Sequence, residues 1–285
     1  MQLCRYKTSA DTLVFGALGP DGIVPLHDVS PSLPSEFAAL VANLSKLENA
    51  LVVAEKVKPS VNISRLVAPL PTPEKIICIG LNYRDHARET GAAIPIEPVV
   101  FSKFSSAISG PYDPIVLPAA STEVDYEAEL VVVIGKSVHR VSAVEAMDCV
   151  AGYCCGHDVS ARDWQKGKPG GQWLLGKSFD SFAPIGPGLT LRSQIADPGK
   201  LAIRMVINGQ TLQDSTTADL IFNIPELIQY VSQVATLRPG DLIFTGTPAG
   251  VGAARTPPRF LQPGDVCRVE IEGLGAIENR CVAEV

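Results

Sequence analysis

The stretch VDYEAELVVVIGK covers residues 124–136 and places Asp125, Glu127 and Glu129 at alternate positions. The apolar run LVVVI follows directly and predicts a buried strand, on which side chains two residues apart point to the same face. Carboxylates held that close repel one another, and burying them is unfavourable by several kcal/mol per ion unless something compensates. The pattern therefore indicates either a solvated strand end or carboxylates held together by a cation.

Short apolar runs separated by Gly and Pro turns continue on both sides of this stretch. Many short strands with few helices between them predict an α+β fold that is rich in β-structure. The clearest runs are KIICIG (75–80), PVVFSKF (98–104), VAGYCCG (150–156) and DLIFTGTP (241–248). Helices are expected at 35–56, 143–149 and 225–236, the last with Pro225 near its first turn.

The chain divides in two at a proline-rich segment. Residues 3–30 predict short strands joined by Gly turns, and the expected helix at 35–56 follows them. VAPLPTPEK (67–75) then interrupts the pattern with three prolines and is a plausible linker. We expect a small N-terminal domain at 1–70 and a larger domain at 71–285.

Composition excludes several classes of function. The 285 residues carry a net charge of −6 and have no basic run, which argues against a nucleic-acid partner. No stretch approaches the length of apolar sequence that spans a membrane, and the first residues resemble neither a signal peptide nor a transit peptide. We therefore expect a cytoplasmic protein. The seven cysteines contain no Cys-x-x-Cys pair and predict reduced, buried side chains.

A second source of carboxylate ligands lies in HDVSARDWQ (157–165). Asp158 follows an apolar, strand-like run and precedes a polar turn, which is a common way to place a metal ligand. Asp158 is equally compatible with a helix N-cap role, since Ser160 and Asp163 lie nearby.

A candidate general base lies in GLNYRDHARETG (80–91). If Asn82 caps a short helix and Gly91 ends it, His86 and Glu89 lie three residues apart on one helical face. A carboxylate beside an imidazole orients the ring for proton transfer. The alternative is an ordinary His–Glu pair on the surface.

Three further features suggest a site for an anionic substrate. In TGTPAGVG (245–252), backbone N–H groups and the Thr247 hydroxyl are placed to hold a carboxylate or an oxyanion, unless the segment is a plain turn. Lys177 is a candidate partner for an anion. The Gly-rich segment 166–172 is expected to be a mobile lid, the alternative being an ordinary surface loop.

Together these pieces resemble the fumarylacetoacetate hydrolase family over essentially all of residues 75–285. They occur in the family's order and agree best with its fumarylacetoacetate hydrolase domain-containing group, which includes acylpyruvate hydrolases, oxaloacetate decarboxylases and oxaloacetate tautomerases. The resemblance implies a mixed β-roll, preceded here by the small N-terminal domain, and a homodimer. It also implies that Glu127, Glu129 and Asp158 bind one Mg²⁺, Mn²⁺ or Ca²⁺ ion, consistent with the preference of hard cations for oxygen ligands.

The resemblance further implies an enzyme that acts on a small 2-oxo acid with a second carbonyl, through a metal-stabilised enolate. His86 and Glu89 would form the catalytic dyad, and Lys177 would be the active-site lysine. The dyad favours hydrolysis of a C–C bond, with oxaloacetate tautomerisation or decarboxylation as alternatives and a non-catalytic binding protein as a remote one. The implied substrate-lining residues are Arg162, Gln165 and Thr247.

Overall fold

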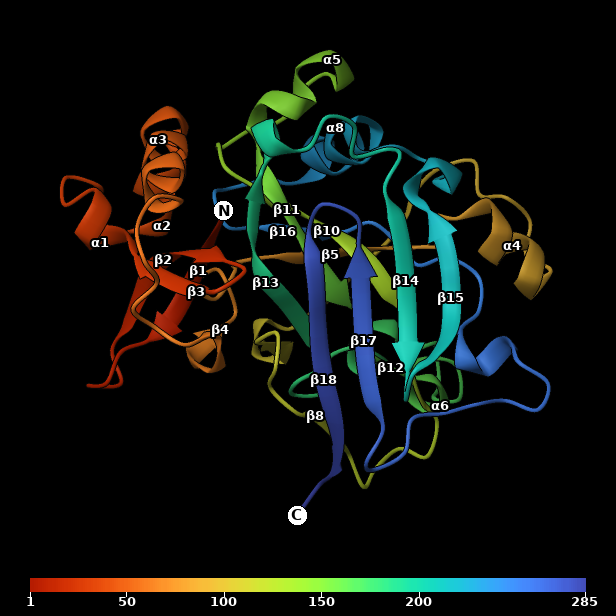
Figure 1. The fold of residues 1–285 in the computed structure, drawn as a ribbon. Helices are drawn as coiled ribbons and strands as arrows, with labels where there is room; N and C mark the ends of the chain where they lie inside the picture. The colour runs from red at the N-terminus through yellow and green to blue at the C-terminus, as the bar shows by residue number, and fades with distance from the viewer.

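The computed structural model describes residues 1–285 and shows a large mixed sheet, a smaller five-stranded sheet and a two-stranded ribbon (Figure 1). In spatial order the large sheet contains β3 (Gly22–Pro25), β2 (Leu13–Gly19), β1 (Gln2–Lys7), β13 (Ala183–Leu191), β11 (Val150–His157), β10 (Ala128–Ile134), β16 (Leu242–Phe244), β5 (Ile76–Gly80) and β6 (Val99–Lys103), with β4 (Leu66–Val67) beside β1 and β7 (Ile108–Ser109) beside β13. The five-stranded sheet runs β15 (Gln210–Thr216), β14 (Ala202–Ile207), β17 (Val266–Ile271), β18 (Gly275–Ala283) and β8 (Ile115–Leu117), and the ribbon pairs β12 (Ser160–Ala161) with β9 (Val124–Asp125).

The helices are short and connect or cover these sheets. They are α1 (Leu26–Val29), α2 (Phe37–Val41), α3 (Leu44–Ala54), α4 (Arg84–Thr90), α5 (Ala143–Ala146), α6 (Arg162–Gln165), α7 (Trp173–Gly176) and α8 (Ile224–Val234). Single 3₁₀ turns are η1 (Ile63–Arg65), η2 (Ser105–Ala107), η3 (Met147–Cys149), η4 (Arg192–Gln194), η5 (Thr217–Asp219) and η6 (Gly252–Ala254). No helix combines the length and the apolar character that crossing a bilayer requires.

The core lies between the two larger sheets. Every residue of β10 and β11 is buried, which explains their continuous apolar sequences. Strands β10, β11 and β13 contact β14, β17 and β18 of the facing sheet. Parallel pairs β5–β16 and β8–β18 occur among antiparallel ones, so the predicted strand-rich, mixed α+β fold is confirmed. All seven cysteines are buried and free, as expected.

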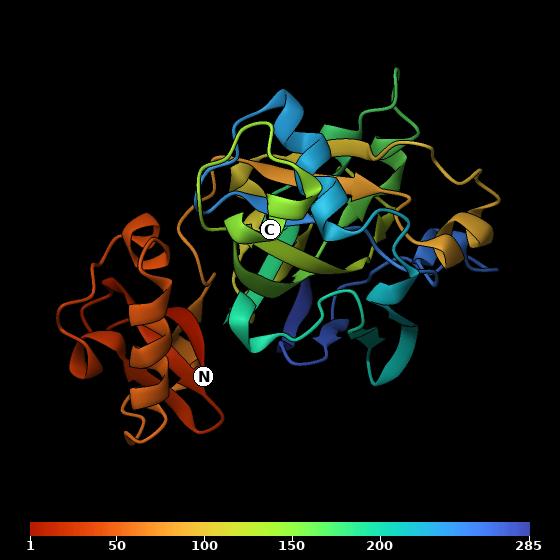
Figure 2. The ribbon, with the colours of Figure 1, turned by 90° about the horizontal axis from the view of Figure 1, so that it is seen from above.

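The first part of the chain forms a lobe beside the rest (Figure 2). It contains β1 to β4 and α1 to α3, and β1 contacts β13 at one register pair, Leu3 with Leu189. The predicted helix at 35–56 is interrupted at Ala42 and Asn43 and forms α2 and α3. The division at residue 70 stays a prediction.

Two local predictions were wrong. The stretch 124–134 is not one strand, because the chain leaves β9 after Asp125 and re-enters regular structure at Ala128. Asn82 does not cap α4, whose N-cap is Tyr83. The Asn82 side chain instead forms hydrogen bonds with the main chain of Phe222 and Thr245. Gly91 does end α4, in the left-handed conformation at φ 66°.

Candidate metal and substrate site

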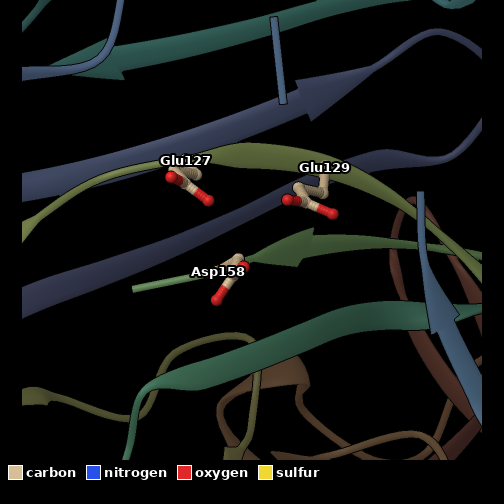
Figure 3. Close-up of side chains that lie close together, drawn as sticks. All are labelled: Glu127, Glu129 and Asp158. Carbon is tan, nitrogen blue, oxygen red and sulfur yellow. The ribbon is translucent and has the colours of Figure 1, made fainter. Parts of the chain in front are cut away.

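Three buried carboxylates converge where β10 and β11 meet (Figure 3). Glu127 precedes β10, Glu129 lies within it, and Asp158 directly follows β11. Because these strands pair antiparallel, with Glu129 opposite Gly156, the start of one meets the end of the other. Each side chain offers one oxygen within 4.8 Å of the others. The structure thus brings the three predicted ligands together.

The charges of this cluster are only partly compensated. Burial, followed by repulsion from Asp158 and Glu127, raises the pKa of Glu129 well above its usual value. Burial also disfavours ionisation of Glu127, but Lys177 and Arg162 outweigh it and hold the pKa of Glu127 below its usual range. The hydrogen bond to Glu129 comes from the Gly246 N–H at 2.8 Å. A further positive charge would stabilise this cluster.

The donor set fits a hard divalent cation. Carboxylate oxygens are the ligands that Mg²⁺, Mn²⁺ and Ca²⁺ prefer. The buried Oδ1 atom of Asp158 accepts no well-aligned hydrogen bond and has the Lys103 ammonium 2.6 Å away, so it keeps a lone pair for a ligand. Glu127, Glu129 and Asp158 are therefore the residues that would hold such an ion.

Lys177 lies against two of the three carboxylates. Its Nζ donates to Glu127 Oε2 at 2.7 Å and to Asp158 Oδ2 at 2.8 Å, and it sits 5.1 Å from the centre of the Phe101 ring. Burial alone would lower the pKa of Lys177, but the attraction of Asp158 and Glu127 outweighs burial and raises it. The ammonium therefore stays charged beside the cluster.

Arg162 is held by protein groups. Its guanidinium donates to Asp125 Oδ2 at 2.8 Å, to Glu127 Oε1 at 2.6 Å and to Gln165 Oε1 at 2.9 Å. Asp125 also accepts from the N–H groups of the 252–253 turn, so it supports the site without joining the trio. Arg162 lines the cavity, but its charge is directed at these partners.

The predicted dyad lies on α4, as its spacing indicated. His86 Nδ1 is 3.2 Å from Glu89 Oε2, and Glu89 Oε1 accepts from the Gly250 N–H at 2.9 Å. Because an ionised carboxylate only accepts, Nδ1 carries the proton and Nε2 is left as an acceptor. The arrangement suits a group that takes up and returns a proton.

The 245–252 loop gives its donors to the protein's own carboxylates. Gly246 N donates to Glu129, as described, and Gly252 N donates to Asp125 at 2.7 Å. The Thr247 hydroxyl donates to Ala128 O at 2.9 Å and accepts from Gln213. The expectation that this loop offers these groups to an oxyanion therefore needs revision, because they already have partners that shape the site.

One cavity of about 510 Å³ joins these features. It is lined by the polar residues His86, Glu89, Thr90, Glu127, Glu129, Arg162, Gln165, Lys166, Lys177 and Thr247. The larger apolar residues of its wall are Ile79, Leu81, Phe101, Trp173 and Val251. All the predicted catalytic and substrate residues therefore share one cavity, while Asp158 lies behind its surface and is fully buried.

The segment 166–172 borders this cavity. Lys166 at one end and Trp173 just after the other line it, and Gly170 and Gly171 have φ values of 78° and 68° that favour glycine. The lid motion of this segment stays a prediction.

Sequence reasoning missed Lys103, which lies 2.6 Å from Asp158 Oδ1. The available signal was a single charged residue in the otherwise uncharged run PVVFSKF. It also missed Asp85, whose Oδ1 accepts from Ala249 N at 3.2 Å and whose Oδ2 accepts from the Ser215 hydroxyl at 3.0 Å. Asp85 thereby fixes the start of α4, for which the sequence offers no local signal.

Comparison with known proteins identifies the family. The profile of the fumarylacetoacetate (FAA) hydrolase C-terminal family matches residues 75–282. The chain belongs to the fumarylacetoacetate hydrolase family. It is 49% identical over 265 residues to "Oxaloacetate tautomerase FAHD2A, mitochondrial" of Bos taurus, covering 92% of this chain and 84% of that protein.

Two further members extend the comparison. The fumarylacetoacetate hydrolase domain-containing protein 2 homolog of Dictyostelium discoideum is 48% identical over 278 residues, covering 93% of this chain and 91% of that protein. The crystal structure of maleylpyruvate hydrolase from Sphingobium sp. SYK-6, in complex with manganese(II) and pyruvate, superposes with a TM-score of 0.82 at 31% identity and covers 100% of both chains. The chain is thus an enzyme of this family, whose members here include tautomerases and hydrolases.

Proposed function

We propose that this enzyme is a divalent-metal-dependent oxaloacetate keto–enol tautomerase. The observation that carries the proposal is that the His86–Glu89 pair lines the same cavity as Glu127 and Glu129 of the buried carboxylate trio. The identity of nearly half of all aligned positions with a protein named oxaloacetate tautomerase supports the choice of reaction.

The residues of the chain supply binding and proton transfer. A cation held by Glu127, Glu129 and Asp158 would act as a Lewis acid on the 2-oxo group. Lys177 and Gln165 line the cavity and would orient a substrate carboxylate from its wall. His86 Nε2 would take the proton from the enol oxygen and return it to the far carbon of the enol double bond, which leaves the ketone, while Glu89 keeps the ring in the required tautomer.

Hydrolysis of a C–C bond in an acylpyruvate-type substrate is the second candidate. It is favoured by the overall similarity to maleylpyruvate hydrolase, and the same His86 would then activate a water molecule. Sequence reasoning ranked hydrolysis first. We reverse that order because the tautomerase relative is more similar, at 49% against 31% identity. Oxaloacetate decarboxylation uses the same residues and ranks third.

The test follows the substrates by NMR with purified enzyme and Mg²⁺ or Mn²⁺. We expect enol and keto oxaloacetate to interconvert faster than in buffer, with little loss of CO₂. Rapid release of an acid and pyruvate from an acylpyruvate, without faster oxaloacetate tautomerisation, would favour the hydrolase. No acceleration of either reaction, with metal present, would remove both proposals and favour a binding protein.

The oligomeric state and the cellular compartment belong to the same proposal. We infer a homodimer from the family resemblance, and sedimentation equilibrium measures the state directly. Cytoplasmic placement stays a prediction. The Bos taurus relative is named a mitochondrial protein, so cell fractionation should compare both compartments.

A further inference from the structure

Lys103 is the charged residue of β6, and its side chain is completely buried. Its Nζ donates to three main-chain carbonyls: Val159 at 3.0 Å, Lys177 at 2.6 Å and Phe182 at 2.8 Å. It also lies 2.6 Å from Asp158 Oδ1. One ammonium group therefore has four oxygen neighbours and no contact with water.

The contact with Asp158 is an ion pair, and the other three are hydrogen bonds to neutral carbonyls. An ammonium group has only three protons for these four oxygen neighbours. The distance of 2.6 Å between Nζ and Oδ1 holds this oxygen in place, although no well-aligned hydrogen bond joins the two atoms. A carboxylate oxygen with this single contact keeps a lone pair for a metal ion.

The carbonyls that Lys103 binds belong to the segments that carry the site. Val159 follows Asp158 directly, and its N–H donates to Phe182 O at 3.2 Å. The third carbonyl is that of Lys177, whose ammonium contacts Glu127 and Asp158. Because β6 pairs with β5 along its whole length, Lys103 ties both segments to the edge of the large sheet.

We propose that Lys103 is a positioning residue that fixes Asp158 and Lys177 relative to each other and thereby sets the geometry in which the cation binds. Lys103 does not line the cavity, so it acts through these two residues. The inference rests on the proposed metal-dependent function. It gives Lys103 a role in the site that differs from that of an ordinary buried ion pair.

The direction in which the metal Kd changes when Lys103 is replaced separates a positioning role from a purely electrostatic one. By Coulomb's law alone, removing a positive charge near a bound cation tightens metal binding. Loss of a group that orients a ligand instead weakens binding, typically by about 10- to 100-fold. Calorimetric titration of the full chain with Mn²⁺, without substrate, should show that Lys103→Met raises the metal Kd by at least about tenfold.

Lys75 provides the matched control. Its Nζ lies 2.8 Å from the buried carboxylate of Asp241, which directly precedes β16. Lys75 does not line the cavity of the candidate site. Lys75→Met also breaks a lysine–aspartate pair of the large sheet. It should change thermal stability without changing the Kd for Mn²⁺.

Unchanged or tighter Mn²⁺ binding by folded Lys103→Met would overturn the inference. Wild-type protein that binds no Mn²⁺ would remove the proposed metal dependence as well, so the two failures differ. If Lys103→Met does not fold, Lys103→Gln is titrated, since its shorter amide keeps a donor. A crystal structure of the Mn²⁺-loaded wild type gives an independent answer: Lys103 Nζ on the same three carbonyls supports the role, and Lys103 turned away from them overturns it.

Discussion

At the scale of single residues, Glu129 lowers the stability of the metal-free protein and is also a proposed metal ligand. Its pKa is raised by burial and by Asp158 and Glu127, so its charged form destabilises the fold at neutral pH when no cation is bound. Glu129→Gln keeps an acceptor for Gly246 and removes the charge. We expect the metal-free variant to be more stable by about 1 kcal/mol or more, and its Kd for Mn²⁺ to rise by roughly 100-fold.

Thermal unfolding in EDTA and calorimetric titration measure the two effects of Glu129→Gln separately. Equal metal affinity in the variant and the wild type would show that the carboxylate trio does not hold the ion.

His86 is the residue whose loss should affect proton transfer alone. His86→Ala should slow tautomerisation by about 10²- to 10⁴-fold, the usual contribution of a general base. Metal binding should be unchanged, because His86 is not among the three clustered carboxylate ligands. NMR rates with saturating Mg²⁺ test this, and an undiminished rate would assign proton transfer to another group.

His157 should make stability depend on pH. It is fully buried without a hydrogen-bond partner, and burial, aided by Lys103, lowers its pKa from 6.5 to about 3. Below pH 6.5 the unfolded chain gains a proton that the folded chain does not, so stability falls as pH drops through this window.

The stability difference between wild type and His157→Gln isolates this effect from other titrating groups. From pH 7 to pH 5, His157 should lower wild-type stability by about 2 kcal/mol relative to the variant. Denaturant unfolding at both pH values measures the difference. A difference that does not change with pH would contradict a neutral buried imidazole.

At the scale of elements, the site depends on contacts between short segments. Helix α4 carries the dyad, and the 245–252 loop holds it through Gly250 N to Glu89 and Ala249 N to Asp85. Glu89 therefore contacts the catalytic imidazole and the loop at once. This explains why so short a helix holds His86 in a defined orientation.

The segment 166–172 is the element most suited to move. Its residues are exposed apart from Gln172, which is half-buried, while Gln165 and Trp173 at its ends line the cavity. We predict that it closes over a bound 2-oxo acid and shields it from water. Hydrogen exchange with and without oxalate, in the presence of Mg²⁺, should show added protection in 166–172. Unchanged exchange at saturating oxalate would make it an ordinary loop and leave the metal site untouched.

At the scale of the whole molecule, all predicted site residues lie after residue 75. The first lobe pairs with β13 at a single register position, and Gln2 adds side-chain hydrogen bonds to Thr190 and Leu274. Pro71, Thr72 and Glu74 of the connecting segment are exposed. A glutamate-specific protease should therefore cut after Glu74 and leave residues 75–285 folded and able to bind Mn²⁺. Circular dichroism and calorimetry of the separated fragment test the proposed division, and an unfolded fragment would refute it.

The sequence by itself determined the features that depend on neighbouring residues. The i, i+3 spacing fixes His86 beside Glu89 once α4 forms, and the apolar run before Asp158 places it at a strand end. The order of the motifs along the chain was enough to indicate the family. The break between β9 and β10 was not predicted, and the N–H groups at 252–253 that bind Asp125 beside it are distant in the sequence.

Only the tertiary structure decided which groups complete the site. Lys103 and Asp158 are 55 positions apart in the sequence, and Gly252 and Asp125 are 127 apart. No local spacing encodes such pairs, because they form only when β6, β11 and the loop after β16 are brought together in the fold. A buried ammonium or N–H group takes the nearest acceptor that packing provides. Packing therefore gave Lys103, Arg162 and the 245–252 loop their partners.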